Sequence, residues 1–324
     1  AMDYPAESLM GHQAEVVTDC AFGNARIIDI GAERIKELLA NRKIVVVAGF
    51  QGCDVNGNIT TLGRGGSDTS AVAIASALKA DVCEIYTDVD GIYTADPNIC
   101  SQARKIAAIS YDEMLNMASL GAKVLQIRSV GFAKKYNVPV HVRSSFSEEE
   151  GTMVINENAG MERLVVSAVT HDKDQARITL KKVPDQPGVA AKIFSPIAEA
   201  GIVVDMIIQN LNYDGVNDIT FTVDESDFKQ TKAVLEDMKS ELEYKELLCD
   251  NQVAKVSIVG AGMVSNPGVA AKMFEALAEK NINIGMISTS EIKVSCLIAR
   301  DLAEEAVKAI HNKFDLDKLG QDND

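Results

Sequence analysis

Basic residues, paired cysteines and long apolar runs are all scarce in this chain of 324 residues. It contains 32 Lys and Arg against 47 Asp and Glu, which gives a formal net charge of -15. Nucleic-acid binding requires a basic face, so this balance argues against a nucleic-acid partner. No apolar run approaches the roughly 20 residues that cross a bilayer, and no signal peptide is visible. We therefore expect neither a nucleic-acid nor a membrane partner.

The residue types that form disulfides and metal sites also lack the spacings that such sites require. The six cysteines are scattered without a Cys-x-x-Cys pair, which favours a reducing cytoplasm over a disulfide framework or a zinc site. We expect most of them to be buried apolar side chains. The four histidines stand apart from any metal-ligand spacing, so we assign them no catalytic role. The chain is predicted to be cytoplasmic and to have no protein-bound metal.

The first half of the chain alternates between strand-like and helix-like segments, which predicts an α/β domain with a mostly parallel sheet. The apolar, β-branched run at 43–50 predicts a buried parallel strand. The expected strands are 15–18, 44–50, 82–87 and 140–142, and the expected helices are 32–41, 67–79, 111–119 and 123–136.

A glycine-rich segment with the sequence Leu-Gly-Arg-Gly-Gly-Ser-Asp-Thr-Ser-Ala occupies 62–71, where the helix at 67–79 is expected to begin. Ser67 or Asp68 can cap that helix. Glycines let backbone N–H groups approach a ligand, and the helix dipole favours negative charge there. Arg64 adds a planar guanidinium suited to a carboxylate or a phosphate. The segment therefore predicts an anion site, with a glycine-rich turn and an ordinary cap as the alternative.

The second half contains an internal duplication. Polar residues from Ser144 to Gly160 interrupt the earlier pattern, so we place a domain boundary near Asn158, between 1–158 and 159–324. The segment Pro-Gly-Val-Ala-Ala-Lys at 187–192 recurs at 267–272, a shift of 80 positions. Each copy has the pattern of a strand, a helix, two strands and a final helix, which predicts two small α+β domains, at about 175–247 and 252–320.

Gly-Ala-Gly at 260–262 begins like a dinucleotide fingerprint. The third glycine and the βαβ context of that fingerprint are missing, so we interpret the segment as a turn before the second helix.

Taken together, these segments resemble bacterial aspartokinases. The resemblance rests on Val-Ala-Gly-Phe-Gln-Gly at 47–52, the glycine-rich segment, Tyr-Thr-Asp-Val-Asp-Gly-Ile-Tyr-Thr-Ala-Asp-Pro at 86–97 and Gly-Ala-Lys-Val-Leu at 121–125. The duplicated half resembles that family's tandem, ferredoxin-like ACT domains. The resemblance implies an amino-acid-kinase fold and ATP-dependent phosphorylation of L-aspartate to 4-phospho-L-aspartate. That reaction begins lysine, threonine and methionine biosynthesis.

By this resemblance, the glycine-rich segment holds the substrate. Arg64 would bind a carboxylate of aspartate, Gly65, Gly66 and Ser67 would supply backbone N–H groups, and Asp68 would orient cationic groups around the phosphoryl group. Mg²⁺ is expected with ATP, without an assigned protein ligand. The residues expected to bind the nucleotide are Ser67, Thr87, Asp88, Tyr93, Asp96, Pro97, Lys123 and Val124.

The resemblance also implies that the ACT domains bind lysine, threonine or both, and pair edge to edge in a homo-oligomer. For Asp185, and for Asn266 before the second copy's helix, the alternative is that they are merely helix N-caps. The expected effector positions are Asp185, Val203, Val204, Asp205 and Gln209 in the first copy, and Val269, Ala270, Asn283, Ile284, Ser290 and Glu291 in the second.

Two departures from the family pattern bear on activity. The family's Lys-Phe-Gly-Gly-Thr-Ser and Ser-Thr-Gly-Glu segments are not in the sequence, and Asn98 replaces an arginine that usually follows Asp-Pro. We therefore expect that the first portion of the kinase domain is missing and that this chain alone turns over little aspartate. A second function stays open, a catalytically silent amino-acid-sensing module. Met161 is a candidate internal start for a separate regulatory subunit.

Overall fold

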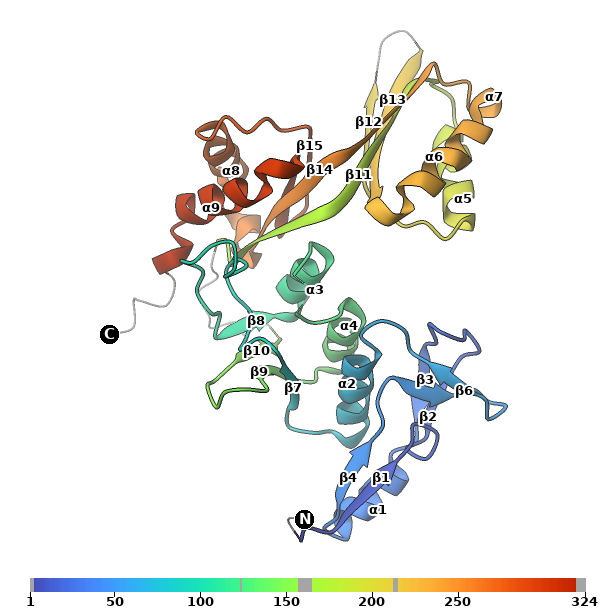
Figure 1. Cartoon of the computed structure of the whole chain (residues 1–324), viewed down its shortest axis with the longest axis vertical. Helices are drawn as coiled ribbons and strands as arrows, with labels where there is room; N and C mark the ends of the chain where they lie inside the picture. Colours follow the sequence, from blue (N-terminus) through green and yellow to red (C-terminus); the bar gives the residue numbers. More distant parts are fainter. Residues whose placement is uncertain (1–2, 123, 157–164, 212–214, 319–324) are drawn as a thin grey trace. The chain divides into compact units, whose positions relative to one another are not determined.

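The computed structural model describes residues 3–122, 124–156, 165–211 and 215–318, and its chain divides into two compact units (Figure 1). The first unit comprises Ala1–Pro97 and Ala103–Leu164, and the second comprises Asn98–Gln102 and Val165–Asp324. The boundary expected near Asn158 lies outside the described residues, as does Met161.

The first unit contains every helix and strand expected from the sequence, together with short strands that were not foreseen. Its helices are α1 (Glu33–Ala40), α2 (Gly66–Leu78), α3 (Tyr111–Ser119) and α4 (Ile127–Tyr136). Its strands are β1 (Ala6–Leu9), β2 (Val16–Thr18), β3 (Ile27–Ile30), β4 (Ile44–Val47), β5 (Gln51–Cys53), β6 (Ile59–Thr61), β7 (Cys83–Thr87), β8 (Ala108–Ser110), β9 (Val140–Ser144) and β10 (Thr152–Ile155).

These strands form three small sheets, in the orders β1-β4, β3-β2-β5-β6 and β7-β9-β10-β8. The pairs β1–β4, β7–β9 and β8–β10 are parallel, whereas β2–β3, β5–β6 and β9–β10 are antiparallel. The α/β class is confirmed, and the pairing is mixed because hairpins accompany the parallel strands. Helix α2 packs against both α4 and β7.

Strand β4 is parallel, as predicted, but it is not fully buried. Val45 and Val47 pack against a core that contains Leu9. Ile44 and Val46 point the other way and remain 52% and 56% exposed. The burial prediction is therefore wrong, because an apolar run does not by itself show whether both faces of its strand are covered.

The second unit consists of one antiparallel sheet and the helices that pack on it. The sheet order is β12-β13-β11-β14-β16-β15. Its strands are β11 (Ala168–Pro184), β12 (Val204–Leu211), β13 (Val216–Asp224), β14 (Glu246–Val259), β15 (Met286–Thr289) and β16 (Lys293–Ala299). Its α-helices are α5 (Val189–Glu199), α6 (Phe228–Asp237), α7 (Lys239–Leu242), α8 (Val269–Ala278) and α9 (Ala303–Lys313).

The two sequence copies share the long central strands β11 and β14. Residues 175–181 of β11 pair with 246–253 of β14 in the first copy, next to β13. In the second copy, 254–259 of β14 pair with β16 on one side and with 168–172 of β11 on the other. Each copy thus takes its fourth strand from a shared strand, and in Figure 1 α5, α6 and α7 lie beside the first copy while α8 and α9 lie beside the second.

The duplication extends to burial. Ile202 and Met206 are buried in the first copy, and their counterparts Ile282 and Met286 are buried in the second. The Gly-Ala-Gly segment does form a turn, a short 3-10 helix at Ala261–Ser265. No helix in the described ranges is long and apolar enough to cross a membrane.

Candidate functional site

The glycine-rich segment forms a tight loop between β6 and α2. Gly63 and Gly65 have φ values of +78° and +67°. Gly65 is the N-cap of α2, and no side chain caps the helix. The prediction that Ser67 or Asp68 caps it is therefore wrong, because the left-handed glycine turns the chain into the helix two residues earlier. Ser67 and Asp68 instead lie in the first turn.

This loop has free donors for an anion. In the described part of the chain, the backbone N–H groups of Gly65 and Ser67 have no acceptor. The side chain of Arg64 is exposed and forms no hydrogen bond or ion pair with any described residue. These groups surround the N-terminus of a helix of 13 residues, whose dipole adds a positive field.

The turn between β4 and β5 is tied to the same helix. The hydroxyl of Ser70 accepts a hydrogen bond from the backbone N–H of Phe50 at 2.9 Å and donates to the carbonyl of Gly66 at 2.6 Å. The N–H of Leu62 donates to the carbonyl of Phe50 at 2.9 Å. The motifs at 47–52 and 62–71 therefore form one structure.

Helix α4 begins at Ile127 rather than at Lys123, so Val124 precedes the helix and Lys123 lies outside the described residues. The residue before the helix, Gln126, is extended, and its side chain covers Gly65. A Cβ atom on Gly65 would lie 1.7 Å from Cγ of Gln126. Only glycine therefore fits at position 65 beside Gln126. The predicted start of the helix, at Lys123, is wrong by four residues.

Arg128, in the first turn of α4, also reaches the loop. Its guanidinium donates to the carbonyls of Leu62 and Ala25 and to the side chain of Asn24. Neither Gln126 nor Arg128 was among the residues predicted from the sequence. One signal could have pointed to Arg128, because a cation in the first turn of a helix is disfavoured by the dipole and so indicates a specific contact.

Asp68 is the acidic group of this site. Burial raises the pKa of its carboxyl group above the ordinary value of 3.8, although hydrogen bonds from the Ser67 hydroxyl and the Gln126 backbone oppose the shift. No lysine or arginine of the described ranges forms an ion pair with it. Burial, helped by the charge of Asp68, also raises the pKa of the Cys83 thiol to about 11.

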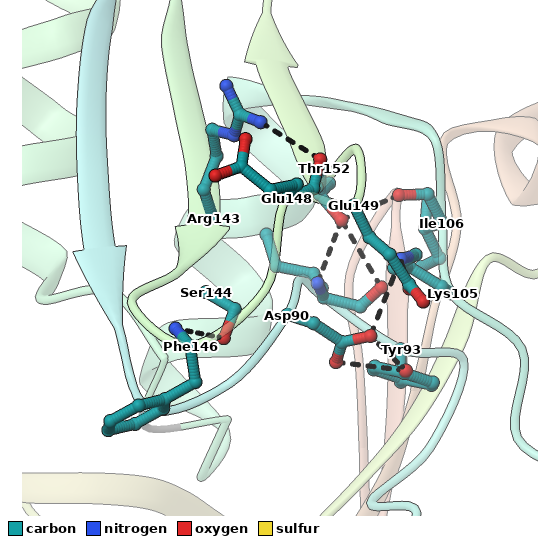
Figure 2. Close-up of polar contacts among 12 residues, drawn as sticks. Asp90, Tyr93, Lys105, Ile106, Arg143, Ser144, Phe146, Glu148, Glu149 and Thr152 are labelled. Carbon is teal, nitrogen blue, oxygen red and sulfur yellow. Dashed lines mark hydrogen bonds and ion pairs between the residues drawn. The ribbon is translucent and has the colours of Figure 1, made fainter.

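A second polar cluster follows the carboxyl end of β7 (Figure 2). The hydroxyl of Thr87 donates to Asp88 at 3.0 Å, and that of Tyr93 donates to Asp90 at 3.0 Å. Lys105 bridges Asp90, at 3.4 Å, and Glu149, at 3.3 Å. Burial and the neighbouring Asp90 raise the pKa of Tyr93 to about 12, so the hydroxyl of Tyr93 stays protonated.

Hydrogen bonds fasten this cluster to the sheet. The hydroxyl of Thr152 accepts from the N–H of Ile92 at 2.8 Å and donates to the carbonyl of Ile106 at 2.6 Å (Figure 2). The N–H of Ser145 donates to the carbonyl of Thr87 at 2.8 Å. Thr87 and Asp88 thus form one hydrogen-bonded pair and Tyr93 and Asp90 another, both in the segment that follows β7.

The other described residues that are expected to bind the nucleotide lie on the loop after this cluster, ahead of α4 and on α2. Asp96 and Pro97 are exposed on the loop beyond the cluster, and Val124 is half-buried. Ser67 lies on α2, which packs against β7. No group of three or more His, Cys, Asp or Glu side chains in the described ranges could hold a metal ion.

The cysteines bear out the expectation only in part. All six are free thiols. Cys83, Cys100 and Cys296 are buried, whereas Cys20 is exposed. Buried positions therefore account for half of them rather than for most.

In the second unit, Asp185 is not the N-cap of α5, and Asn266 is not the N-cap of α8 but the C-cap of the 3-10 helix at Ala261–Ser265. The N-caps of α5 and α8 are Gly188 and Gly268, with φ values of +92° and +89°. Asp185 accepts a hydrogen bond from the side chain of Asn217 at 2.8 Å, and Asn266 donates to the carbonyl of Gly262 at 2.7 Å. The alternative that these residues are merely helix N-caps is wrong.

The effector positions of each copy fall into separate groups. Asp185 precedes α5, whereas Val203–Asp205 follow it. Because α5 has 11 residues, its two ends lie about 16 Å apart. Val203 is 77% exposed. The carboxylate of Asp205 is already paired with Lys255, a lysine on β14 that is only 2% exposed.

The other positions follow the same division. In the second copy, Val269 and Ala270 begin α8, whereas Asn283 and Ile284 follow its end. Gln209 is exposed on β12. Ser290 and Glu291 are exposed in the turn between β15 and β16.

Comparison with known proteins identifies similar families and relatives. The amino acid kinase family matches residues 3–144, and ACT domains match residues 177–243 and 256–314. The chain is 53% identical over 314 residues to an aspartate kinase of Pseudomonas putida, covering 97% of this chain and 76% of the relative. It is 51% identical over 317 residues to an aspartokinase of Helicobacter pylori, covering 97% and 78%.

Solved structures give the same result. Aspartokinase III of E. coli in complex with aspartate and ADP, in the R-state, has a TM-score of 0.79 at 30% identity, over 96% of this chain and 70% of that one. The complex of that enzyme with lysine and aspartate, in the T-state, has a TM-score of 0.75 at 31% identity, over 95% and 69%. An aspartate kinase of Clostridium acetobutylicum has a TM-score of 0.81 at 28% identity, over 94% and 70%.

Proposed function

The chain belongs to the aspartokinase family and is an aspartate kinase, and we propose that its glycine-rich loop is where the phosphoryl group passes from ATP to aspartate. One observation carries this proposal, namely the free N–H groups of Gly65 and Ser67 beside the unpaired Arg64 at the start of α2. Aspartate and ATP are both anions, and a site that receives them needs such donors.

The reaction fits this site chemically. A carboxylate oxygen of aspartate attacks the γ-phosphorus, the bond to the β,γ-bridging oxygen breaks, and ADP leaves. The acceptor is already an anion at neutral pH, so the enzyme needs no general base. Catalysis then consists of alignment and charge neutralisation, in which Arg64 holds a carboxylate of aspartate and the N–H groups of Gly65, Gly66 and Ser67 face the reacting oxygens. Asp68 orients cationic groups.

For the nucleotide, we assign the cluster after β7 as one wall of the pocket. Thr87, Asp88 and Tyr93 form this wall, and Ser67, Asp96, Pro97, Lys123 and Val124 are the further candidates. The E. coli relative that binds ADP supports a nucleotide of this class. Mg²⁺ would enter with the phosphates, which supply most of its ligands in kinases, and we assign no protein ligand to it.

The second unit is the proposed sensor. ACT domains provide the allosteric regulation, and the lysine complex of the E. coli relative supports lysine as an effector, with threonine as the second candidate. Because the expected ligand residues of one copy lie at opposite ends of its first helix, a complete pocket requires a second copy. We therefore propose a cytoplasmic homo-oligomer in which ACT domains pair edge to edge.

A trapping assay tests the proposal. The full-length protein is incubated with aspartate and Mg-ATP, and hydroxylamine converts the acyl phosphate into a hydroxamate, which is measured as its coloured ferric complex. We expect hydroxamate and ADP in equal amounts, suppressed by lysine or threonine. Binding of lysine or threonine by calorimetry without any hydroxamate from the complete protein would instead support the silent sensing module.

A further inference from the structure

All the hydrogen bonds described for the guanidinium of Arg128 go to residues around the glycine-rich loop. It donates to the carbonyl of Leu62 at 2.5 Å, to the carbonyl of Ala25 at 2.8 Å and to Oδ1 of Asn24 at 3.1 Å. Within the described ranges, no carboxylate forms a salt bridge with it, although its charge contributes to lowering the pKa of Asp19, after the backbone hydrogen bonds from Arg26 and Ala21. We propose that Arg128 is a positioning residue, which shapes the loop that binds aspartate without touching the substrate.

Leu62 is the point where this loop is fixed. Its side chain is fully buried, its N–H donates to Phe50, and its carbonyl accepts from Arg128. Both ends of that residue are therefore held. The loop begins at the next residue, Gly63, where a Cβ atom would lie 3.0 Å from Oδ1 of Asn24, another partner of Arg128.

The loop's own hydrogen bonds join Gly63 to Gly66, and Gly65 and Gly66 to Thr69 and Ser70 of α2, but none in the described ranges involves Arg64. Gly63, Gly65 and Gly66 have no side chains, and Arg64 is exposed. Glycine loses more backbone freedom on ordering than any other residue, so an unsupported loop of this composition would sample many conformations. Gln126 covers Gly65 at the far end of the loop, and Arg128 holds the near end. Arg64 therefore stands between two supports that both come from the start of α4.

This arrangement predicts which substrate should be affected. If the hydrogen bonds of Arg128 are lost, aspartate must order the glycine-rich loop when it binds, and the cost of ordering the loop weakens the binding of aspartate. Among the described residues, Thr87, Asp88 and Tyr93 form no hydrogen bond or ion pair with Arg128. Their segment is held instead by the bonds of Thr87 to Ser145 and of Ile92 to Thr152 on β10. Loss of Arg128 should therefore raise the KM for aspartate and leave the KM for ATP almost unchanged. This inference rests on the proposed function, because it assigns the loop to aspartate.

The test uses the complete enzyme with Arg128→Gln and Arg128→Lys. For Arg128→Gln we expect the KM for aspartate to rise about tenfold or more, as for the loss of hydrogen bonds to a charged group, with less than about a twofold change for ATP. Arg128→Lys, which can still donate to one carbonyl, should lie between. Asn24→Ala removes one acceptor of the three and should have a smaller effect in the same direction.

Two controls separate positioning from general loss of structure. Lys134→Gln removes another cation of the same helix, one that pairs with Asp112 at its surface, and should leave both KM values unchanged. In Arg128→Ala, added methylguanidinium should restore part of the aspartate affinity, which it could not do for a misfolded protein. Thermal unfolding of each variant reports its folding.

Several outcomes would overturn the inference. It fails if Arg128→Gln keeps the aspartate KM of the parent enzyme, or if the KM values for aspartate and ATP rise equally. If Arg128→Gln does not fold, the Arg128→Lys and Asn24→Ala variants decide in the same way. Failure of the proposed function is distinct, because then the parent enzyme itself forms no aspartyl phosphate.

Discussion

At the scale of single residues, Asp68 is held in a way that does not favour its charged form. Burial raises the pKa of its carboxyl group, and its hydrogen bonds from Ser67 and the Gln126 backbone do not fully offset that effect. No cation pairs with it in the part of the chain that is described. An acid kept in such a position is typical of a functional site, where charge is maintained at the expense of stability.

We therefore predict that Asp68→Asn loses most activity but raises the thermal stability of the first unit. The raised folded-state pKa means that ionisation of Asp68 destabilises the fold. This destabilisation is absent well below the unfolded value of about 3.8, grows as the pH rises through that value towards the folded pKa, and is fully present at neutral pH. The advantage of Asp68→Asn should grow with pH in the same way.

Thermal unfolding of the parent and the variant between about pH 4 and pH 8 measures this difference. Asp81→Asn, at an exposed position just before β7, is the matched control for removing one carboxylate from the surface of the same unit. A variant less stable than its parent at neutral pH would contradict the account of Asp68.

The motif residues could be predicted from the sequence, but their neighbours could not. Arg64 and Asp68 belong to a recognisable segment of ten residues. Gln126 and Arg128 act on that segment from about sixty positions away, and nothing in the local pattern shows that α4 and the loop meet.

At the scale of elements, the loop and the start of α4 fit together through one glycine. Gly65 has a φ value of +67°, and a side chain there would collide with Gln126. Gly57 also has a positive φ value, +83°, but no atom would lie within 4 Å of its Cβ. A side chain would strain the backbone at both positions, but only at Gly65 would it also collide with a neighbouring residue.

We predict that Gly65→Ala abolishes most aspartate kinase activity, whereas Gly57→Ala lowers stability by about 1–2 kcal/mol and leaves activity intact. Steady-state kinetics and urea unfolding measure the two effects. Removing the opposing side chain, in Gly65→Ala combined with Gln126→Gly, should recover part of the activity, because Cβ of Gln126 would itself lie 2.5 Å from the added methyl group. Equal kinetic losses in both glycine variants would show that strain alone matters.

A second element contact joins the two ACT copies. Lys255 on β14 is almost fully buried, and its ion pair is to Asp205, which begins the bulged part of β12. Met206 and Met286, one from each copy, lie in the same apolar cluster with Val253 and Leu297. The copies therefore touch through side chains as well as through shared strands.

Removing the partner of a buried charge is costly, so we predict that Asp205→Asn lowers the free energy of unfolding of the second unit by about 3 kcal/mol. Asp218→Asn breaks a more exposed pair with Lys181 on the same sheet and should lower it by about 1 kcal/mol or less. Denaturant unfolding measures both. Addition of Lys255→Met to Asp205→Asn should restore stability, and a failure to do so would count against the buried-charge explanation.

At the scale of the whole molecule, the two ACT copies are not successive modules. The second copy takes its fourth strand from 168–172, before the first copy begins in the sequence. Ala168 and Val169 are buried there against β14. The second copy therefore cannot be complete without chain that precedes the first.

This topology predicts the behaviour of fragments. A fragment of residues 165–324 should unfold cooperatively, whereas 175–324, which keeps both sequence repeats, should have a lower melting temperature. Hydrogen exchange in the shorter fragment should be faster at 254–259, where the edge of β14 loses its partner. Equal protection of this segment in both fragments would contradict the shared-strand topology.

The sequence by itself determined the α/β class, the duplication at a shift of 80 positions, the glycine-rich segment at the start of a helix and the kinase family. These features depend on local periodicity and on motifs of neighbouring residues. Only the tertiary structure decided that Gly65 caps α2, that Gln126 and Arg128 support the loop, that Asp205 pairs with Lys255, and that β11 serves both ACT copies. Each of these depends on contacts between segments far apart in the chain, and such contacts are fixed by packing and strand register rather than by local pattern.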